Sequence, residues 1–147
     1  MWVIAILFVG AFSESKASDQ TYNQSVNKVL EFKKTINLSD SLTVKNQEHL
    51  DRLIVETILL HWYKTPWDFD GYSNVPKKGV IACGYFVSTP LKHIGFNWNR
   101  YRLAQQDATT IIRKISGEET KFYRNKSPKE FLNLVKELND GLYVIGF

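Results

Sequence analysis

The chain has 147 residues, of which 44% are hydrophobic and 14% aromatic, and its formal net charge is +4. This length and apolar fraction predict one folded domain and exclude a disordered chain. Eight glycines, four prolines and one cysteine exclude collagen-like and disulfide-stapled proteins, and no Arg- or Lys-rich run indicates a nucleic-acid partner.

Residues 1–17 have the pattern of a signal peptide. The unbroken run of apolar residues and glycine over Trp2–Phe12 is shorter than the roughly 20 residues that a membrane-spanning helix needs. Two small residues, Ser15 and Ala17, precede a predicted cleavage point before Ser18. We therefore expect an exported protein, periplasmic or extracellular, with no integral membrane span after cleavage. The alternative interpretation is a buried N-terminal strand.

Two segments with helical periodicity follow. Apolar residues recur on one face of residues 22–35 and again on one face of residues 47–62. Asn46 is the expected N-cap of the second helix, with Glu48 in its first turn. The polar residues 37–46 predict a connector between the two helices.

The periodicity is lost over residues 64–79, where Trp67, Phe69 and Tyr72 alternate with polar residues, two prolines and two glycines. A loop of about 15 residues with this many aromatic side chains is more often a binding or active-site loop than a plain connection. These rings are equally compatible with stacking on sugar rings and with covering the core.

A helix is expected to begin at or beside Cys83, with Gly95 at its C′ position. Pro90 predicts a kink or an early end of this helix, because proline removes one backbone hydrogen bond. The apolar spacing over residues 101–115 predicts one further helix.

The sharpest local signal is Ser127-Pro128-Lys129-Glu130, which combines an N-cap serine, a proline at the first helical position and a capping-box glutamate. After that helix, the apolar residues 142–147 predict a buried strand. One strand cannot form a sheet alone, so we expect an antiparallel sheet whose pairing region is missing from the chain.

Cys83 is the strongest candidate for a catalytic residue. A buried cysteine commonly packs like a small hydrophobe, so a structural role is one interpretation. At a helix N-terminus, however, the N–H groups and the helix dipole favour the thiolate form and can hold an oxyanion. Gly84 is expected to leave room beside the sulfur for a substrate carbonyl. Asp68 and Asp70 lack the companion ligands of a metal site, so no metal or cofactor is expected.

Three segments lie in the order of a known motif: residues 65–71 (Thr-Pro-Trp-Asp-Phe-Asp-Gly), 82–87 (Ala-Cys-Gly-Tyr-Phe-Val) and 95–96 (Gly-Phe). Together they resemble the NlpC/P60 cysteine-peptidase family of the papain-like group, over residues 46–100. Lys64 and Ala82 depart from the Gly and Asp usual in that family, and the usual Ser after the nucleophile is missing.

The resemblance implies an α+β, papain-like fold with helices in the N-terminal part and an incomplete antiparallel sheet at the C-terminus. Residues 18–45 would be an N-terminal helical extension and residues 46–147 the hydrolase domain. The implied activity is that of a thiol amidase or endopeptidase on peptide or peptidoglycan stem-peptide substrates, with Cys83 as nucleophile. The expected substrate-binding residues are Trp67, Asp68, Phe69, Gly71, Gly84 and Tyr85.

A thiol nucleophile needs a histidine base within hydrogen-bonding reach. His93 lies ten residues beyond Cys83, or roughly 15 Å along a straight helix. His49 is expected at the surface, and His61 is expected to pack or cap. The resemblance therefore places the base beyond Phe147. The rival interpretations are a non-catalytic cell-envelope binding module that uses the aromatic loop, and a helical interaction protein with a structural cysteine.

Overall fold

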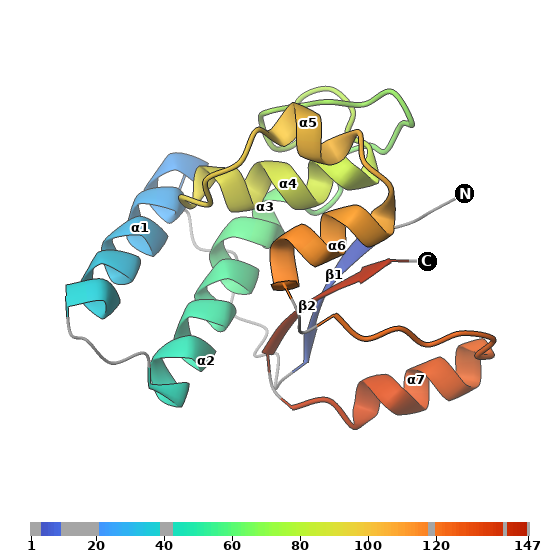
Figure 1. Cartoon of the computed structure of the whole chain (residues 1–147). Coiled ribbons are helices and arrows are strands. Elements are labelled where there is room, and N and C mark those ends of the chain that lie inside the picture. The colour runs from blue at the N-terminus through green and yellow to red at the C-terminus, as the bar shows by residue number, and fades with distance from the viewer. Residues whose placement is uncertain (1–3, 10–20, 39–42, 118–119, 140, 147) are drawn as a thin grey trace.

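The computed structural model describes residues 4–9, 21–38, 43–117, 120–139 and 141–146, which form a helix-rich α+β fold (Figure 1). The elements in chain order are β1 (Ile4–Val9), α1 (Tyr22–Leu38), α2 (Val44–Leu53), the π-helical segment η1 (Ile54–Leu59), α3 (Leu60–Trp62), α4 (Cys83–His93), α5 (Arg100–Ala104), α6 (Ala108–Ser116), α7 (Pro128–Lys136) and β2 (Gly141–Gly146).

Helix α1 confirms the first predicted helix, but the expected N-cap of the second helix was wrong. Thr43 has an extended backbone, and its hydroxyl accepts the N–H of Asn46 at 3.2 Å. Helix α2 therefore starts one turn earlier than predicted, and Glu48 lies outside its first turn. Residues 39–42 of the predicted connector lie outside the described residues.

The second helical stretch ends at Trp62, as predicted, but its middle is a π-helix. The six residues of η1 follow α2 directly, and α3 continues from them. Apolar spacing does not reveal this change, since a single wide turn keeps Ile54 and Ile58 on the buried face.

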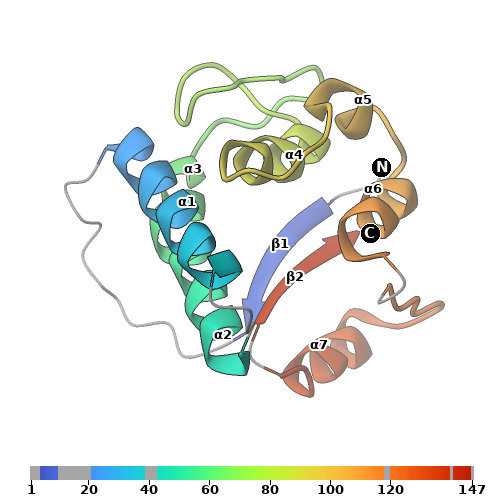
Figure 2. The same cartoon turned by 60° about the vertical axis from the view of Figure 1, so that its left-hand side comes forward.

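The hydrophobic core surrounds α4. Val87 of α4, Val29 of α1 and Ile58 of η1 are fully buried and belong to one cluster, which also contains Leu103 and Ile111 from α5 and α6. Helix α1, which the sequence assigned to an N-terminal extension, thus shares its core with the segment that carries Cys83 (Figure 2).

Helix α4 begins at Cys83 and Gly95 follows its end with a φ of 94°, so both of these predictions are confirmed. Of the kink or early end predicted at Pro90, the early end does not occur, because the helix continues to His93. Pro90 and its neighbour Leu91 are buried, and packing of these side chains stabilises a turn that lacks one backbone hydrogen bond.

The single helix predicted over residues 101–115 is two helices. The Asn99 side chain caps α5, and the Asp107 carboxylate caps α6 by accepting the N–H of Thr110 at 3.0 Å. Asp107, in the extended N-cap conformation, starts a new helix. The local cap therefore fixes this helix boundary, which the apolar spacing alone did not reveal. By contrast, the capping box of Ser127 and Glu130 confirms the predicted start of α7.

The expectation that the C-terminal strand lacks a partner in this chain was wrong. Strands β1 and β2 pair antiparallel, from Ile4 opposite Gly146 to Val9 opposite Gly141. Strand β2 confirms the predicted strand one residue earlier, but residues 141–145 are half-buried and not buried as expected. The Leu142 N–H donates to the buried carboxyl of Asp51 on α2. Burial is the main cause of the raised pKa of Asp51.

Strand β1 lies within the predicted signal peptide and has the paired-strand arrangement that the alternative interpretation anticipated. The predicted cleavage point and residues 10–20 lie outside the described residues. Cleavage of this segment stays a prediction.

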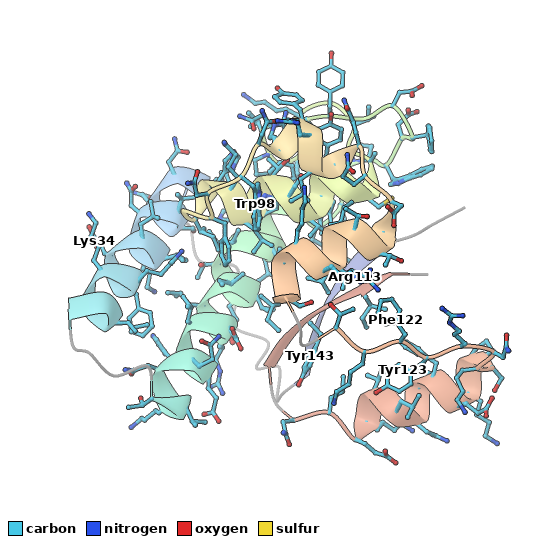
Figure 3. The ribbon with its side chains drawn as sticks, in the orientation of Figure 1. Lys34, Trp98, Arg113, Phe122, Tyr123 and Tyr143 are labelled. Atoms are coloured by element: carbon cyan, nitrogen blue, oxygen red, sulfur yellow. The ribbon has the colours of Figure 1, made fainter. Side chains whose placement is uncertain are left out.

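The segment that precedes α7 contacts α6. The guanidinium of Arg113 lies 5.1 Å from the centre of the Phe122 ring, and both side chains are labelled in Figure 3. Helix α7 itself has no buried residue, and Leu132 on it is exposed. This helix therefore adds little to the core on which the site rests.

Candidate functional site

Cys83 occupies the first position of α4, as predicted, and is half-buried. Its N-cap, Ala82, has an extended backbone and no side-chain acceptor. Within the residues that the structure describes, the N–H groups of Gly84 and Tyr85 donate no hydrogen bond. This helix end thus presents partial positive charge without a competing side-chain cap.

The aromatic loop, residues 64–79, folds back onto residues 80–82, which lead into Cys83. Ile81 forms isolated backbone bridges with both Trp67 and Tyr72, and Ala82 N–H donates to the Gly71 carbonyl at 2.8 Å. A Cβ added to Gly71 would lie 2.5 Å from the backbone nitrogen of Ile81. Glycine is needed at position 71 because two backbone segments meet there.

Three rings of this loop point away from the core. Trp67 is 57% exposed, Phe69 75% and Tyr72 65%. The two acidic residues between them shape the turn, since Asp70 N–H donates to the Asp68 carboxylate at 2.9 Å. Among the described residues, no group of three His, Cys, Asp or Glu side chains could hold a metal ion.

Gly84 serves packing, and the expectation that it leaves room for a substrate was wrong. A Cβ at this position would lie 2.6 Å from the carbonyl oxygen of Ala104 at the end of α5. The space beside Gly84 is therefore filled by backbone. Tyr85, the next residue, is half-buried, and its ring packs edge-on against Tyr101 at 5.9 Å.

Arg100, which the sequence gave no reason to select, connects the aromatic loop to α4. It is only 4% exposed, and its guanidinium donates to the Tyr72 and Ser73 carbonyls at 2.8 and 3.1 Å. It also donates to the Thr89 hydroxyl at 2.6 Å. No carboxylate among the described residues lies within 4 Å of this buried cation.

His93 and His61 lie at the opposite end of α4 from Cys83. His93 is the last residue of α4, and its Nδ1 lies 2.8 Å from the Tyr22 hydroxyl. The ring of His61 also packs against Tyr22, at 5.5 Å, and its Nε2 lies 3.1 Å from the buried Ser25 hydroxyl. The shared contact with Tyr22 places His61 near His93, which lies about 15 Å along the helix axis from Cys83.

These groups form a directional hydrogen-bond chain. Trp62 Nε1–H donates to the Tyr22 hydroxyl at 3.0 Å, and that hydroxyl donates to His93 Nδ1. His93 Nε2–H in turn donates to the Asn74 side-chain oxygen at 3.2 Å. Neutral His93 satisfies every member of this chain, because Nδ1 must accept while Nε2 donates.

The environment favours the neutral forms of Tyr22 and His93 in this chain and of the neighbouring His61. Burial raises the pKa of Tyr22 to about 12, against the opposing hydrogen bond from Trp62. Burial lowers the pKa of His93, and the positive charges of Arg100 and Lys92 lower it further. Burial and the charge of Lys77 likewise lower the pKa of His61.

His49 is exposed on α2 and packs edge-on against Phe32 of α1 at 4.7 Å. The three histidines therefore occupy the places that the sequence expected: a surface position, a packed position and the far end of α4. The structure gives none of them the role of a base for Cys83.

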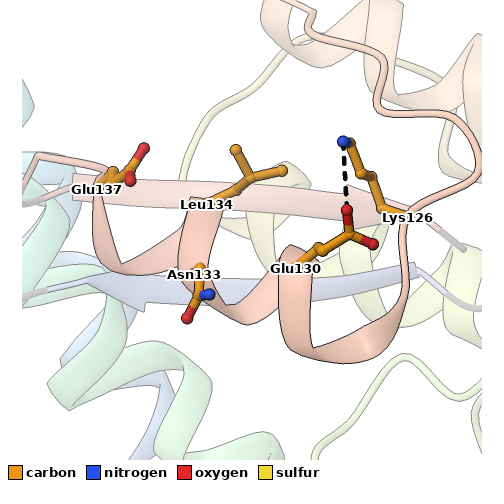
Figure 4. Close-up of a pocket in the computed structure, with 5 residues that line it drawn as sticks. All are labelled: Lys126, Glu130, Asn133, Leu134 and Glu137. Carbon is orange, nitrogen blue, oxygen red and sulfur yellow. Dashed lines mark ion pairs between the residues drawn. The ribbon is translucent and has the colours of Figure 1, made fainter.

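A shallow hollow lies elsewhere, on α7, where Lys126 and Glu130 form an exposed ion pair at 3.6 Å (Figure 4). It is lined by Glu130, Asn133 and Leu134 of α7 and by Lys126 and Glu137, which flank this helix, and it contains no cysteine or histidine.

Comparison with protein-family models, with curated proteins and with solved structures finds no match to this chain. None of the described helices has the length and apolar character needed to span a membrane.

Proposed function

We propose that Cys83 is the nucleophile of an exported, papain-like thiol hydrolase that cleaves peptide or amide bonds, specifically those of peptidoglycan stem peptides. One observation carries the proposal: a half-buried cysteine stands at a helix N-terminus without a side-chain cap, next to an anchored loop with exposed rings. The family resemblance supplies the substrate class.

In the proposed reaction the Cys83 thiolate attacks the amide carbon, and the carbonyl oxygen becomes an oxyanion held by backbone N–H groups at the start of α4. Collapse of this intermediate breaks the C–N bond, and the amine leaves with a proton from an imidazolium. Water then attacks the thioester, giving the carboxylic acid and regenerating the thiol. Trp67, Phe69 and Tyr85 would contact the substrate, with Asp68 and Gly71 shaping the loop.

The base in this proposal is a histidine that follows β2. In Figures 1 and 2 the C-terminal end of β2 and the Cys83 end of α4 lie on the same side of the molecule. Strand β2 also contacts α6 and packs Leu142 and Val144 against the core cluster that contains Val87 of α4. A residue shortly after Gly146 would thus approach the start of α4 far more easily than His61 or His93.

The proposal of export rests on the apolar N-terminal segment, within which β1 lies. Export with cleavage before Ser18 would remove β1 and leave β2 without the partner seen here. Mass spectrometry of the protein purified from its native cell envelope identifies its first residue and so distinguishes the two arrangements. A mass beginning at Ser18 supports export, and an intact residue 1 supports the paired strand.

The nucleophile is tested by the rate of Cys83 alkylation by iodoacetamide at pH 7. We expect the folded protein to react faster than the same thiol in the urea-unfolded chain, because the start of a helix favours the thiolate. Amine release from purified peptidoglycan, by the chain extended to include the next histidine, tests the reaction. Cys83→Ala is the control, and equal release by both proteins would contradict the proposal.

A second candidate is a non-catalytic cell-envelope binding module. It is favoured by the three exposed rings of the loop and by the placement of the histidines away from Cys83. Sedimentation with peptidoglycan distinguishes the two functions. The module predicts that Trp67→Ala abolishes binding and that Cys83→Ala changes nothing, while no amine is released by any variant.

A further inference from the structure

Arg100 makes contacts that a purely structural surface arginine does not. Its two terminal nitrogens donate to carbonyls of the aromatic loop, Tyr72 O and Ser73 O, and to the hydroxyls of Thr89 on α4 and Tyr101 on α5. One side chain therefore fastens the loop to two helices at once.

The guanidinium also lies between two rings. Its central carbon is 4.5 Å from the centre of the Tyr101 ring and 5.1 Å from that of Tyr85. Tyr85 is two residues after Cys83, so the same cation touches both the loop and the first turn of the nucleophile helix. Cation–π contacts and a planar fork of donors are properties that lysine does not reproduce.

The loop has few other tertiary attachments beyond its bridges to Ile81. Lys77 N–H donates to the Thr65 hydroxyl, and Asn74 accepts from His93. The exposed rings of Trp67, Phe69 and Tyr72 contribute little burial. The backbone bridges to Ile81 hold the first part of the loop, and the hydrogen bonds from Arg100 fix the Tyr72–Ser73 part to α4 and α5.

We propose that Arg100 is a positioning residue: it holds the aromatic loop closed beside Cys83 and thereby sets the affinity of this site for a peptide. The peptide part of this inference rests on the proposed function. The anchoring part rests only on the contacts of Arg100.

Anchoring is tested by native-state proteolysis with trypsin, with each cleavage site quantified by mass spectrometry over a series of low urea concentrations. Lys77 and Lys78 are exposed in the loop, and Lys114 lies in α6 as a reference for global unfolding. In Arg100→Gln we expect cleavage after Lys78 to rise at least about tenfold, the factor expected for one hydrogen bond to a charged donor. That cleavage should be nearly independent of urea, as expected for local opening.

Two further variants keep this test decisive. Arg102→Gln removes an exposed arginine from the same helix and should leave both sites unchanged. Thr89→Val removes one acceptor of Arg100 while keeping the cation, and should raise loop cleavage in the same direction if Arg100→Gln does not fold. A parallel rise at Lys78 and Lys114, with the same urea dependence, overturns the proposal, because Arg100 would then stabilise the whole fold.

Positioning is tested by the alkylation of Cys83 with an iodoacetyl-capped tripeptide and with iodoacetamide. The ratio of the two second-order rate constants should exceed one in the natural protein, fall towards one in Arg100→Gln and stay constant in Arg102→Gln. An unchanged ratio in an opened loop overturns positioning. A ratio near one in the natural protein contradicts the proposed function, not the anchoring role of Arg100. In that case the proteolysis experiment alone tests whether Arg100 anchors the loop.

Discussion

The two ends of helix α4 contrast sharply in their chemistry. At its start, Cys83 is half-buried beside exposed rings and lacks a side-chain cap. At its end, His93 belongs to a closed hydrogen-bond chain with Tyr22 and Trp62. The start of α4 thus lies next to exposed rings, whereas side-chain hydrogen bonds hold the histidine at its end. The surroundings of each end, and not the residue type alone, therefore distinguish the two.

The two tryptophans near these ends give the largest expected difference. Trp62 is 1% exposed and donates to Tyr22, whereas Trp67 is 57% exposed. We expect Trp62→Ala to lower the free energy of unfolding by about 3–5 kcal/mol and Trp67→Ala to change it by less than about 0.5 kcal/mol. Urea denaturation followed by circular dichroism measures both. A similar loss of unfolding free energy in the two variants would contradict the proposed difference between the two ends of α4.

Removing the Tyr22 hydroxyl from its hydrogen-bond chain with Trp62 and His93 should have the next largest effect on the free energy of unfolding. Tyr22→Phe deletes the hydroxyl that accepts from buried Trp62 Nε1–H and donates to His93. A buried donor without an acceptor costs about 1–3 kcal/mol, and we expect the free energy of unfolding to fall by that amount. Tyr63→Phe, at a 65% exposed position, is the matched control and should be neutral. A neutral Tyr22→Phe would show that the chain contributes nothing.

The same chain predicts a pH dependence of stability. The pKa of His93 is lower in the folded protein than its ordinary value of 6.5, so the unfolded chain binds more protons as the pH falls through 6.5. Stability should thus be full above about pH 7 and decline as the pH falls from there towards the depressed pKa. His61, Lys92 and Arg100 supply the surrounding groups that act in the same direction.

This dependence is measured by urea midpoints between pH 7.5 and 5. His93→Gln should flatten the decline, because glutamine keeps polar atoms but binds no proton in this range. Midpoints that fall equally in both proteins would assign the decline to other groups. At the alkaline limit, the pKa of about 12 for Tyr22 predicts that its stabilising effect is fully present below pH 10 and is lost as the pH rises from 10 to about 12.

The sequence predicted features of these two ends only where the interacting residues lie close together in the chain. The sequence correctly predicted the start of α4, the capping box at Ser127 and Gly95 at the C′ position. Each of these features depends only on residues within one helical turn. Local reasoning failed where a competing cap decided, as at Thr43 and Asp107.

Long-range contacts were beyond the reach of a single sequence. Arg100 bonds to carbonyls 27 and 28 residues away, and Tyr22 bonds to His93 across 71 residues. Backbone carbonyls leave no trace in residue types, so nothing marked Arg100 as an anchor. The partner of β2 was missed for a similar reason, because the apolar segment at the N-terminus fitted an export signal as well as a strand.

The smallest effect expected is at the N-cap of α4, and it bears most directly on why the two ends differ. Ala82 already has the extended N-cap backbone, so Ala82→Asn and Ala82→Asp should each raise the free energy of unfolding by about 0.5–1 kcal/mol. Only the aspartate adds a negative charge next to Cys83, which disfavours a thiolate there. The Asp variant should therefore be alkylated by iodoacetamide more slowly than the Asn variant at pH 7. Equal rates in two equally stabilised variants would mean that the reactivity of Cys83 does not depend on the electrostatic field at the start of α4.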